Sequence, residues 1–156
     1  MTEFRLFVPG KAAPQGSRKF MGRSNTGKGI MVESSQRVRP WRDLIVTMAL
    51  DAVDQGAPVY VGPVDVALDF TFDRPQHHFG SGKNAGLLKV TAPVFPRTGG
   101  DLDKLCRAAC DALGRKHGAG VIADDADIVR LEATKHFATK LYPVGCVITV
   151  RAAMPL

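Results

Sequence analysis

The chain has 156 residues, of which 45% are hydrophobic and 23% are charged. This length and balance are typical of one folded domain and exclude an intrinsically disordered chain. No apolar stretch approaches the roughly 20 residues that a membrane-spanning helix requires, so we expect no membrane partner. The net charge of +6 and the pI near 9.5 favour a polyanionic partner, and nucleic acid is the commonest polyanion in a cell.

The three cysteines indicate a reducing environment. Cys106, Cys110 and Cys146 form no disulfide-like pattern, and the first residues lack the basic-then-apolar composition of an export signal. We therefore expect a cytoplasmic protein. Cys106 and Cys110 share a helix face, but no CxxC motif accompanies them, so buried structural cysteines are favoured over zinc ligands.

A first strand and a long basic segment open the chain. Residues 3–9 alternate in polarity, which predicts a strand. Residues 10–42 are rich in glycine and cations and hold a single acid, Glu33, so we expect mostly mobile loop with a possible short strand over 29–33. Such a loop can adapt to a phosphate backbone, although a solvated loop without a partner is the alternative. The candidate DNA-binding residues here are Lys11, Arg18, Lys19, Arg23 and Lys28.

A helix, a strand and a long loop follow. Ser34 and Ser35 can cap a helix that runs to about Gln55, with the apolar face Val38, Trp41, Ile45, Met48 and Ala52. Strict alternation predicts a half-buried strand over residues 64–73. Residues 74–100 predict a long loop, with room for a short strand near 88–91, and a loop of this length is typically functional or disordered.

A second helix and two strands complete the chain. The helix is expected to open at Asp101, after Gly99-Gly100, and to end near Gly114. Strands are expected over residues 127–138 and 143–152. The order of these elements predicts a single α+β domain over residues 1–156, with a mixed, mainly antiparallel sheet packed against two main helices.

Short carboxylates gather in one part of this basic chain. Residues 101–127 hold six of the twelve aspartates: Asp101, Asp103, Asp111, Asp124, Asp125 and Asp127. Clustered carboxylates raise one another's pKa and cost stability unless a cation offsets their charge. Asp101 and Asp103 would lie at a helix start, where backbone amides favour negative charge, and a turn can bring Asp124 and Asp125 beside them. These four residues are candidate ligands of Mg²⁺ or Mn²⁺, and the alternative is a helix cap plus ordinary turn residues.

Two motifs resemble a known family. Asp-Leu-Asp opens a helix, and Asp-Asp-x-x-Ile-Val precedes a strand, as in the RusA family of Holliday junction resolvases. The opening FVPGKAAPQGSRKF is also similar to that family, and residues 1–23 and 98–137 carry the resemblance. It implies a RusA-like fold and a homodimeric, Mg²⁺-dependent endodeoxyribonuclease, typical of phages and prophages, that binds four-way junctions and nicks opposed strands.

The resemblance also implies roles for particular residues. Asp101, Asp103 and Asp125 match the family's catalytic aspartates, and Asp124 matches the acid before the last of them. Lys104 stands where the family has Asn, and Arg107 stands where it has Lys. Arginine keeps the charge but releases a proton with difficulty, so a phosphate contact from Arg107 or Lys104 is favoured over proton transfer. An ion pair of Arg107 with an acid four residues away on the helix is the alternative.

Two other functions remain open from the sequence. A non-catalytic DNA-binding module fits the basic charge, but it has no reason to hold acids that repel phosphate. A metal-dependent phosphatase or nucleotidyl-processing enzyme could use Asp-x-Asp, but that motif commonly ends a buried parallel strand. Here Pro96, Gly99 and Gly100 precede the motif, which disfavours such a strand.

Overall fold

Four strands form one mixed sheet. The computed structural model describes residues 2–16, 18–33 and 36–156, without the side chains of residues 18, 19 and 31–33. The sheet has the order β1-β6-β4-β5, and its strands are β1 (Phe4–Pro9), β4 (Val64–Phe72), β5 (Ile128–Phe137) and β6 (Gly145–Ala152). β6 pairs antiparallel with β1 and β4, whereas β4 and β5 run parallel. The expected mixed, mainly antiparallel sheet is confirmed.

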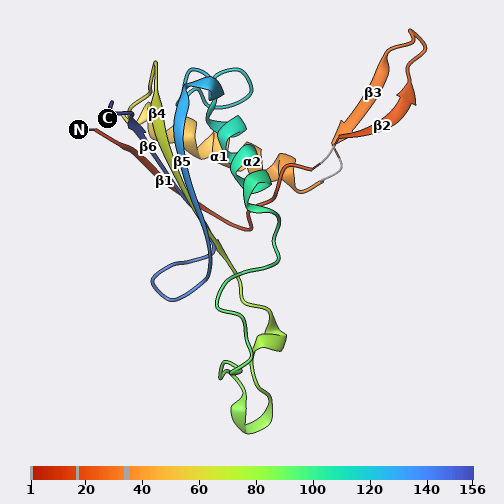
Figure 1. The fold of residues 1–156 in the computed structure, drawn as a ribbon, viewed down its shortest axis with the longest axis vertical. Helices are drawn as coiled ribbons and strands as arrows, with labels where there is room; N and C mark the ends of the chain where they lie inside the picture. Colours follow the sequence, from red (N-terminus) through yellow and green to blue (C-terminus); the bar gives the residue numbers. More distant parts are fainter. Residues whose placement is uncertain (1, 17, 34–35) are drawn as a thin grey trace.

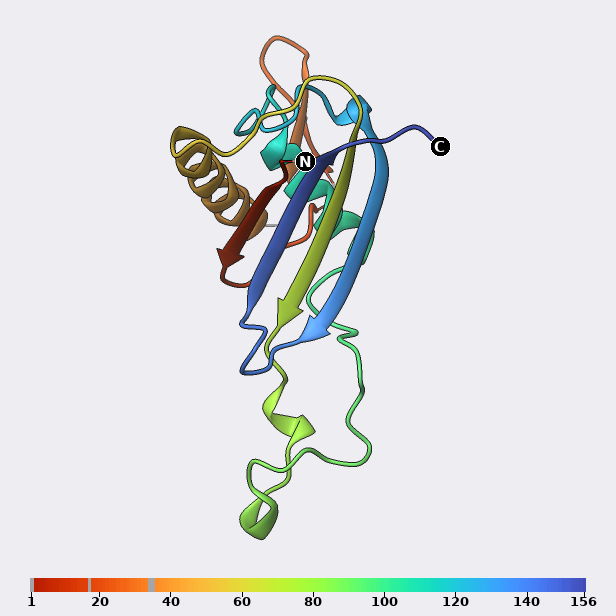
Figure 2. The same ribbon diagram turned by 90° about the vertical axis from the view of Figure 1, so that its left-hand side faces the viewer.

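The polarity pattern of β4 decides which face of the sheet is covered. Val64, Val66, Leu68 and Phe70 are fully or almost fully buried, whereas Asp65, Ala67 and Asp69 between them are partly exposed. Because successive side chains of a strand point to opposite faces, the apolar set lies under the helices and the polar set faces solvent. Figure 2 shows this uncovered face of the sheet, with the helices behind it.

Both main helices, α1 (Val38–Asp54) and α2 (Leu102–Leu113), pack on one side of the sheet (Figure 1). α1 buries Val38, Trp41, Ile45 and Ala49, while the expected Met48 and Ala52 are only partly buried. The expected capping residues Ser34 and Ser35 lie outside the described residues. Within the described ranges, no helix combines the length and apolar character needed to cross a bilayer.

The basic segment is more ordered than its composition indicates. β2 (Arg18–Arg23) and β3 (Gly29–Glu33) pair as an antiparallel hairpin that projects from the body of the protein (Figure 1). A turn joins them, in which the Ser24 amide donates to the Lys28 carbonyl at 2.8 Å and Gly27 has φ +79°. The possible strand over 29–33 is confirmed. The expectation of mobile loop over 18–23 was wrong, because a backbone ladder orders a segment that has no apolar face to reveal it.

A second projection leaves the opposite end of the sheet (Figure 2). Residues 74–100, called the arm below, connect β4 to α2 and contain two short 3-10 turns, η1 (Gln76–His78) and η2 (Gly82–Asn84). Only the isolated bridge between Phe79 and Leu88 stands where a short strand near 88–91 was expected. The long loop is confirmed, but it is an ordered one.

Candidate active site

Two glycines set the start of α2. Gly99 has φ +89°, and a Cβ atom there would lie 2.8 Å from Cε1 of Phe72. Gly100 has φ +113°, and a Cβ atom there would lie 2.6 Å from Cγ of Pro14. Both the backbone conformation and the space therefore require glycine. The Gly-Gly pair presses the chain against the core immediately before the Asp-Leu-Asp motif.

A lysine from the sheet fixes the same segment of backbone. The Lys135 ammonium donates to the carbonyl of Gly100 at 2.8 Å and to that of Thr98 at 3.0 Å. Lys135 faces the helix side of the sheet, opposite Phe70 of β4. The start of α2 is thereby fixed by β5 as well as by its own glycines.

Asp101 occupies the N-cap position of α2, but its side chain accepts no capping hydrogen bond. Its carboxylate is 75% exposed, and Lys104 Nζ lies 3.7 Å from its Oδ2. An exposed ion pair at that distance contributes little to stability. The position predicted for Asp101 is confirmed, whereas the alternative role as a capping side chain is not what the structure shows.

Asp103, Arg107 and Asp111 repeat every four residues along one face of α2. Asp103 and Arg107 line a surface groove between α2 and β5, and Asp125 lines it as well. The rest of the groove is mostly apolar: Leu102, Cys106, Cys110, Ile128, Leu131 and Ala133. In the described part of the chain Arg107 makes no ion pair within 4.0 Å, so the expected alternative of a helical ion pair is not formed.

The later acidic pair sits in the short 3-10 turn η3 (Asp125–Asp127) and just before it. Asp124 Oδ1 accepts a hydrogen bond from the Ala126 amide at 2.8 Å, which is the role of an ordinary turn residue. Asp125 packs over the end of α2, because a Cβ atom on Gly114 would lie 3.0 Å from its Oδ1. A second pocket beside it is lined by Arg107, Asp111, Lys116, His117 and Asp124.

Asp111 is the neighbour that the sequence analysis left unassigned. Burial, and then the charge of Asp111 and a hydrogen bond with it, raise the pKa of Asp125, with a smaller contribution from Asp124; His117 opposes the shift. Arg42 of α1 approaches the Asp111 carboxylate, with Nη1 and Oδ2 3.9 Å apart. The four-residue spacing from Arg107 was the signal that placed Asp111 on this face.

The two acidic pairs lie towards opposite ends of α2. An α-helix rises about 1.5 Å per residue, so Asp103 and Asp111 are separated by about 12 Å along the axis, and Asp125 lies at the Asp111 end. Metal–oxygen bonds are about 2.0–2.6 Å long. Among the described residues, no three His, Cys, Asp or Glu side chains could hold a metal ion together. The expectation that Asp101 and Asp103 meet Asp124 and Asp125 is therefore not met within one chain.

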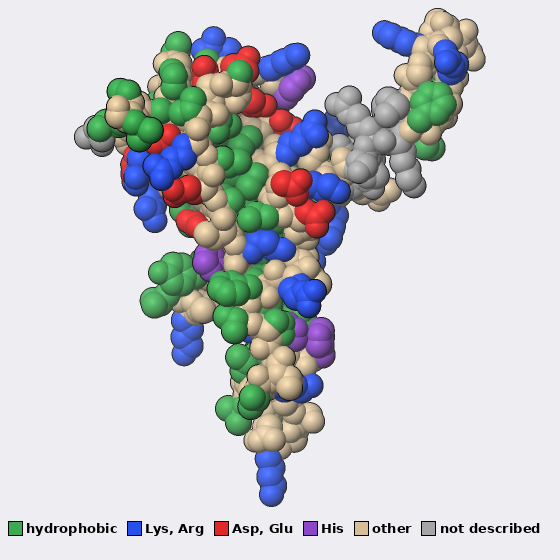
Figure 3. Space-filling model, in the orientation of Figure 1, with side chains coloured by type: hydrophobic (Ala, Val, Ile, Leu, Met, Phe, Trp, Pro, Cys, Tyr) green, Lys and Arg blue, Asp and Glu red, His purple; other side chains and the backbone are tan. Residues whose placement is uncertain are grey.

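The expected DNA-binding residues are spread around this site. Lys11, Arg23 and Lys28 are exposed, and Arg23 Nη1 donates to the Gly27 carbonyl at 3.2 Å. Arg18 and Lys19 lie on β2, and their side chains are outside the described ones. Figure 3 shows acidic side chains near the middle of one face, with cationic side chains around them and on the hairpin.

The cysteines are buried thiols, as expected. Cys106, Cys110 and Cys146 are all free and buried. Burial is the main cause that raises the pKa of each thiol, for Cys110 to about 12. These side chains therefore stay protonated and act as small core residues.

Comparison with known proteins identifies the family. The family model of endodeoxyribonuclease RusA matches residues 9–151, which is nearly the whole chain. No curated protein matches the chain. The matched region includes the helix start, the groove and the acidic turn described above, and enzymes of this family hydrolyse phosphodiester bonds of DNA. The chain belongs to the RusA family of endodeoxyribonucleases.

Proposed function

We propose that this protein is a Mg²⁺-dependent, structure-selective endonuclease that resolves Holliday junctions and related branched DNA. The observation that carries this proposal is the uncommitted carboxylate of Asp101, which lies beside Asp103 at a helix start fixed by Gly99 and Gly100. A carboxylate that neither caps its helix nor forms a strong ion pair is available to an external cation. Membership of the RusA family supports the reaction class.

Hydrolysis of a phosphodiester needs an activated water and stabilisation of the negative charge that develops on phosphorus oxygens. A bound divalent cation, Mg²⁺ or Mn²⁺, would supply both. We assign Asp101 and Asp103 as one half of its ligand set, and Asp125 with Asp124 as the other half. Arg107 lines the groove between these halves without an ion-pair partner in the described chain, which suits it to hold a non-bridging phosphate oxygen.

A homodimer accounts for the separation of the two halves of the ligand set within one chain. One chain brings no three carboxylates together among its described residues, so ligands from a second copy would complete each site. The open edge of the sheet supports such an assembly, because β5 has one neighbour among the described strands and its Leu131 is 46% exposed beside the groove. Two sites related by symmetry also suit paired cuts in opposed strands.

A cleavage assay tests the proposal. The wild-type protein should nick a synthetic four-way junction in Mg²⁺, and Asp103→Asn should bind the junction at least as tightly but not cut it, because the substitution removes a charge that repels phosphate. Asp54→Asn, the same change at an exposed position on α1, is the matched control and should cut normally.

Two results would overturn this function. A wild-type protein that binds the junction but never cuts it would be a DNA-binding module. Faster hydrolysis of a small phosphate ester than of the junction would favour a phosphatase.

We further propose that residues 1–156 form one domain that works in the cytoplasm. One contiguous core takes in residues of both helices and of β1, β4 and β6, and Ile128 and Ala133 of β5 pack against it. Three free, buried cysteines suit a reducing compartment. Loss of cleavage activity on treatment with a reducing agent would count against a reducing compartment.

A further inference from the structure

The arm is cationic along its whole length. Residues 74–100 contain Arg74, Lys83, Lys89 and Arg97 and no acidic residue. All residues from 81 to 90 are exposed. None of these four cations forms an ion pair within 4.0 Å in the part of the chain that the structure describes. The arm therefore presents positive charge that the protein itself leaves uncompensated.

The arm is also held in one conformation. The Arg74 guanidinium stacks over the Phe137 ring, 3.9 Å from its centroid, and donates to the Pro93 carbonyl at 2.7 Å. His78 packs edge-on against the same ring, with centroids 5.6 Å apart. Within the arm, the amide of Lys89 donates to the His78 carbonyl at 2.9 Å. A pre-ordered segment loses less conformational entropy on binding a ligand than a mobile loop would.

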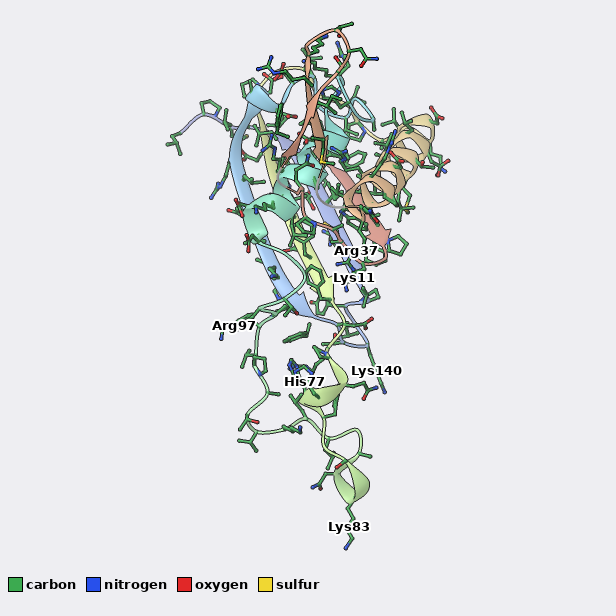
Figure 4. The ribbon with its side chains drawn as sticks, turned by 90° about the vertical axis from the view of Figure 1, so that its right-hand side faces the viewer. Lys11, Arg37, His77, Lys83, Arg97 and Lys140 are labelled. Atoms are coloured by element: carbon green, nitrogen blue, oxygen red, sulfur yellow. The ribbon has the colours of Figure 1, made fainter. Side chains whose placement is uncertain are left out.

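Other exposed cations continue the arm onto the body of the protein. Figure 4 shows Lys83 at the tip of the arm and His77 closer to the sheet. Lys140, from the turn between β5 and β6, lies at the height of His77 in this view, although Figure 1 places that turn on the other side of the arm; Lys11 and Arg37 lie above them near the start of α1. All five side chains are exposed, and none forms an ion pair within the described ranges.

We propose that the arm and the cations above it form a second DNA-contacting surface, which binds the phosphate backbone of a duplex arm of the junction away from the groove between α2 and β5. Its identity as a contact for branched DNA rests on the proposed function. Uncompensated cations on an ordered projection match a phosphate backbone, because each contact releases a condensed counterion. The apolar side chains exposed on the arm, Leu87, Leu88, Val90, Val94 and Phe95, could instead meet a second copy. That occupant is disfavoured because a symmetric contact would bring two arms together, each with four cations and no acidic residue to pair with them.

Two charge-matched variants test this surface. The arm variant carries Lys83→Ala, Lys89→Ala and Arg97→Ala. The control variant carries Arg5→Ala, Arg130→Ala and Arg151→Ala, on the solvent face of the sheet, where these arginines lie among Asp65, Asp69 and Glu132. Binding of a fluorescent four-way junction is measured without divalent cation, so that cleavage plays no part, over a series of salt concentrations.

The arm variant should bind more weakly and with a shallower salt dependence, its slope falling by up to about 0.9 for each phosphate that the variant no longer neutralises. The weakening should appear with junction arms of about three helical turns and vanish with arms of about one turn or less, because the short arms leave no duplex for the tip to reach. The control variant should bind as the wild type does. Lys83→Arg with Lys89→Arg, which keeps the charge, should restore binding.

Three outcomes would overturn the proposal: equal binding by the arm variant and the wild type, equally weakened binding in the arm and control variants, or a change of oligomeric state in the arm variant by sedimentation. The result is separable from the proposed function. A wild-type protein that never cuts DNA but loses salt-dependent binding in the arm variant would refute the nuclease and support the surface. A protein that cuts junctions but binds them equally with and without the arm cations would do the reverse.

Discussion

Replacing the carboxylate of Asp101 should leave α2, the helix that it precedes, undisturbed. Asp101→Asn should change the free energy of unfolding by less than about 0.5 kcal/mol, because the carboxylate makes no capping hydrogen bond and only one exposed ion pair. Cleavage of the junction should fall at least about 100-fold, since a metal ligand supports several kcal/mol of transition-state stabilisation. Urea denaturation and single-turnover cleavage measure the two effects. A drop in stability above about 1 kcal/mol with normal cutting would show a structural residue.

Gly100 should tolerate substitution far less well than Asp101. Gly100→Ala is expected to cost about 3 kcal/mol, because a contact of 2.6 Å with Pro14 adds to the cost of placing alanine at φ +113°. Gly56→Ala is the matched control: its φ is +101° but nothing lies within 4 Å of the added Cβ, so only the backbone cost of about 1 kcal/mol remains. Chemical denaturation compares the two, and equal destabilisation would mean that the contact with Pro14 relaxes freely.

Part of the site was readable from the sequence. The Asp-Leu-Asp motif after two glycines identified the helix start, and the structure places Asp101 at its N-cap. The place of Asp111 beside Asp125 was not readable, because it depends on how the turn η3 folds back over the end of α2. For the same reason the sequence could not show that the two acidic pairs lie towards opposite ends of one helix.

At the scale of elements, Arg74 should decide how well the arm is ordered. Arg74→Ala removes both the stacking on Phe137 and the hydrogen bond to Pro93, a local destabilisation of about 1–2 kcal/mol. Amide exchange over residues 76–95 should accelerate and trypsin should cut faster after Lys83, while the midpoint of global unfolding changes little. Arg97→Ala is the control, since that exposed side chain has no such contacts. Unchanged exchange in Arg74→Ala would show that other contacts hold the arm.

The elements themselves were predictable where they bury an apolar face. Alternation revealed β4, and spacings of three and four residues revealed α1, because both patterns are set by contact with one core. β2 has no such face, and it pairs with β3 through the backbone, so its sequence resembles a loop. The parallel pairing of β4 with β5 was equally hidden, since side-chain patterns do not record strand direction.

At the scale of the whole molecule, the proposed dimer depends on the free edge of the sheet. Leu131→Glu should leave the stability of one chain within about 0.5 kcal/mol, because the side chain is already 46% exposed. It should shift sedimentation towards a monomer and reduce Mg²⁺ affinity together, because a buried charge would oppose association. Val61→Glu, at an 85% exposed position outside the groove, should do neither. A monomeric Leu131→Glu protein that keeps full affinity for Mg²⁺ would refute ligand sharing between copies.

The arm is fixed to the core at both of its ends. At the first end Arg74 stacks on Phe137, and at the second Lys135 donates to the carbonyls of Thr98 and Gly100. Insertions or deletions between these two attachment points would leave the start of α2 where it is. A longer or shorter arm would therefore change how far the protein reaches along its DNA, while the active site at the start of α2 stays the same.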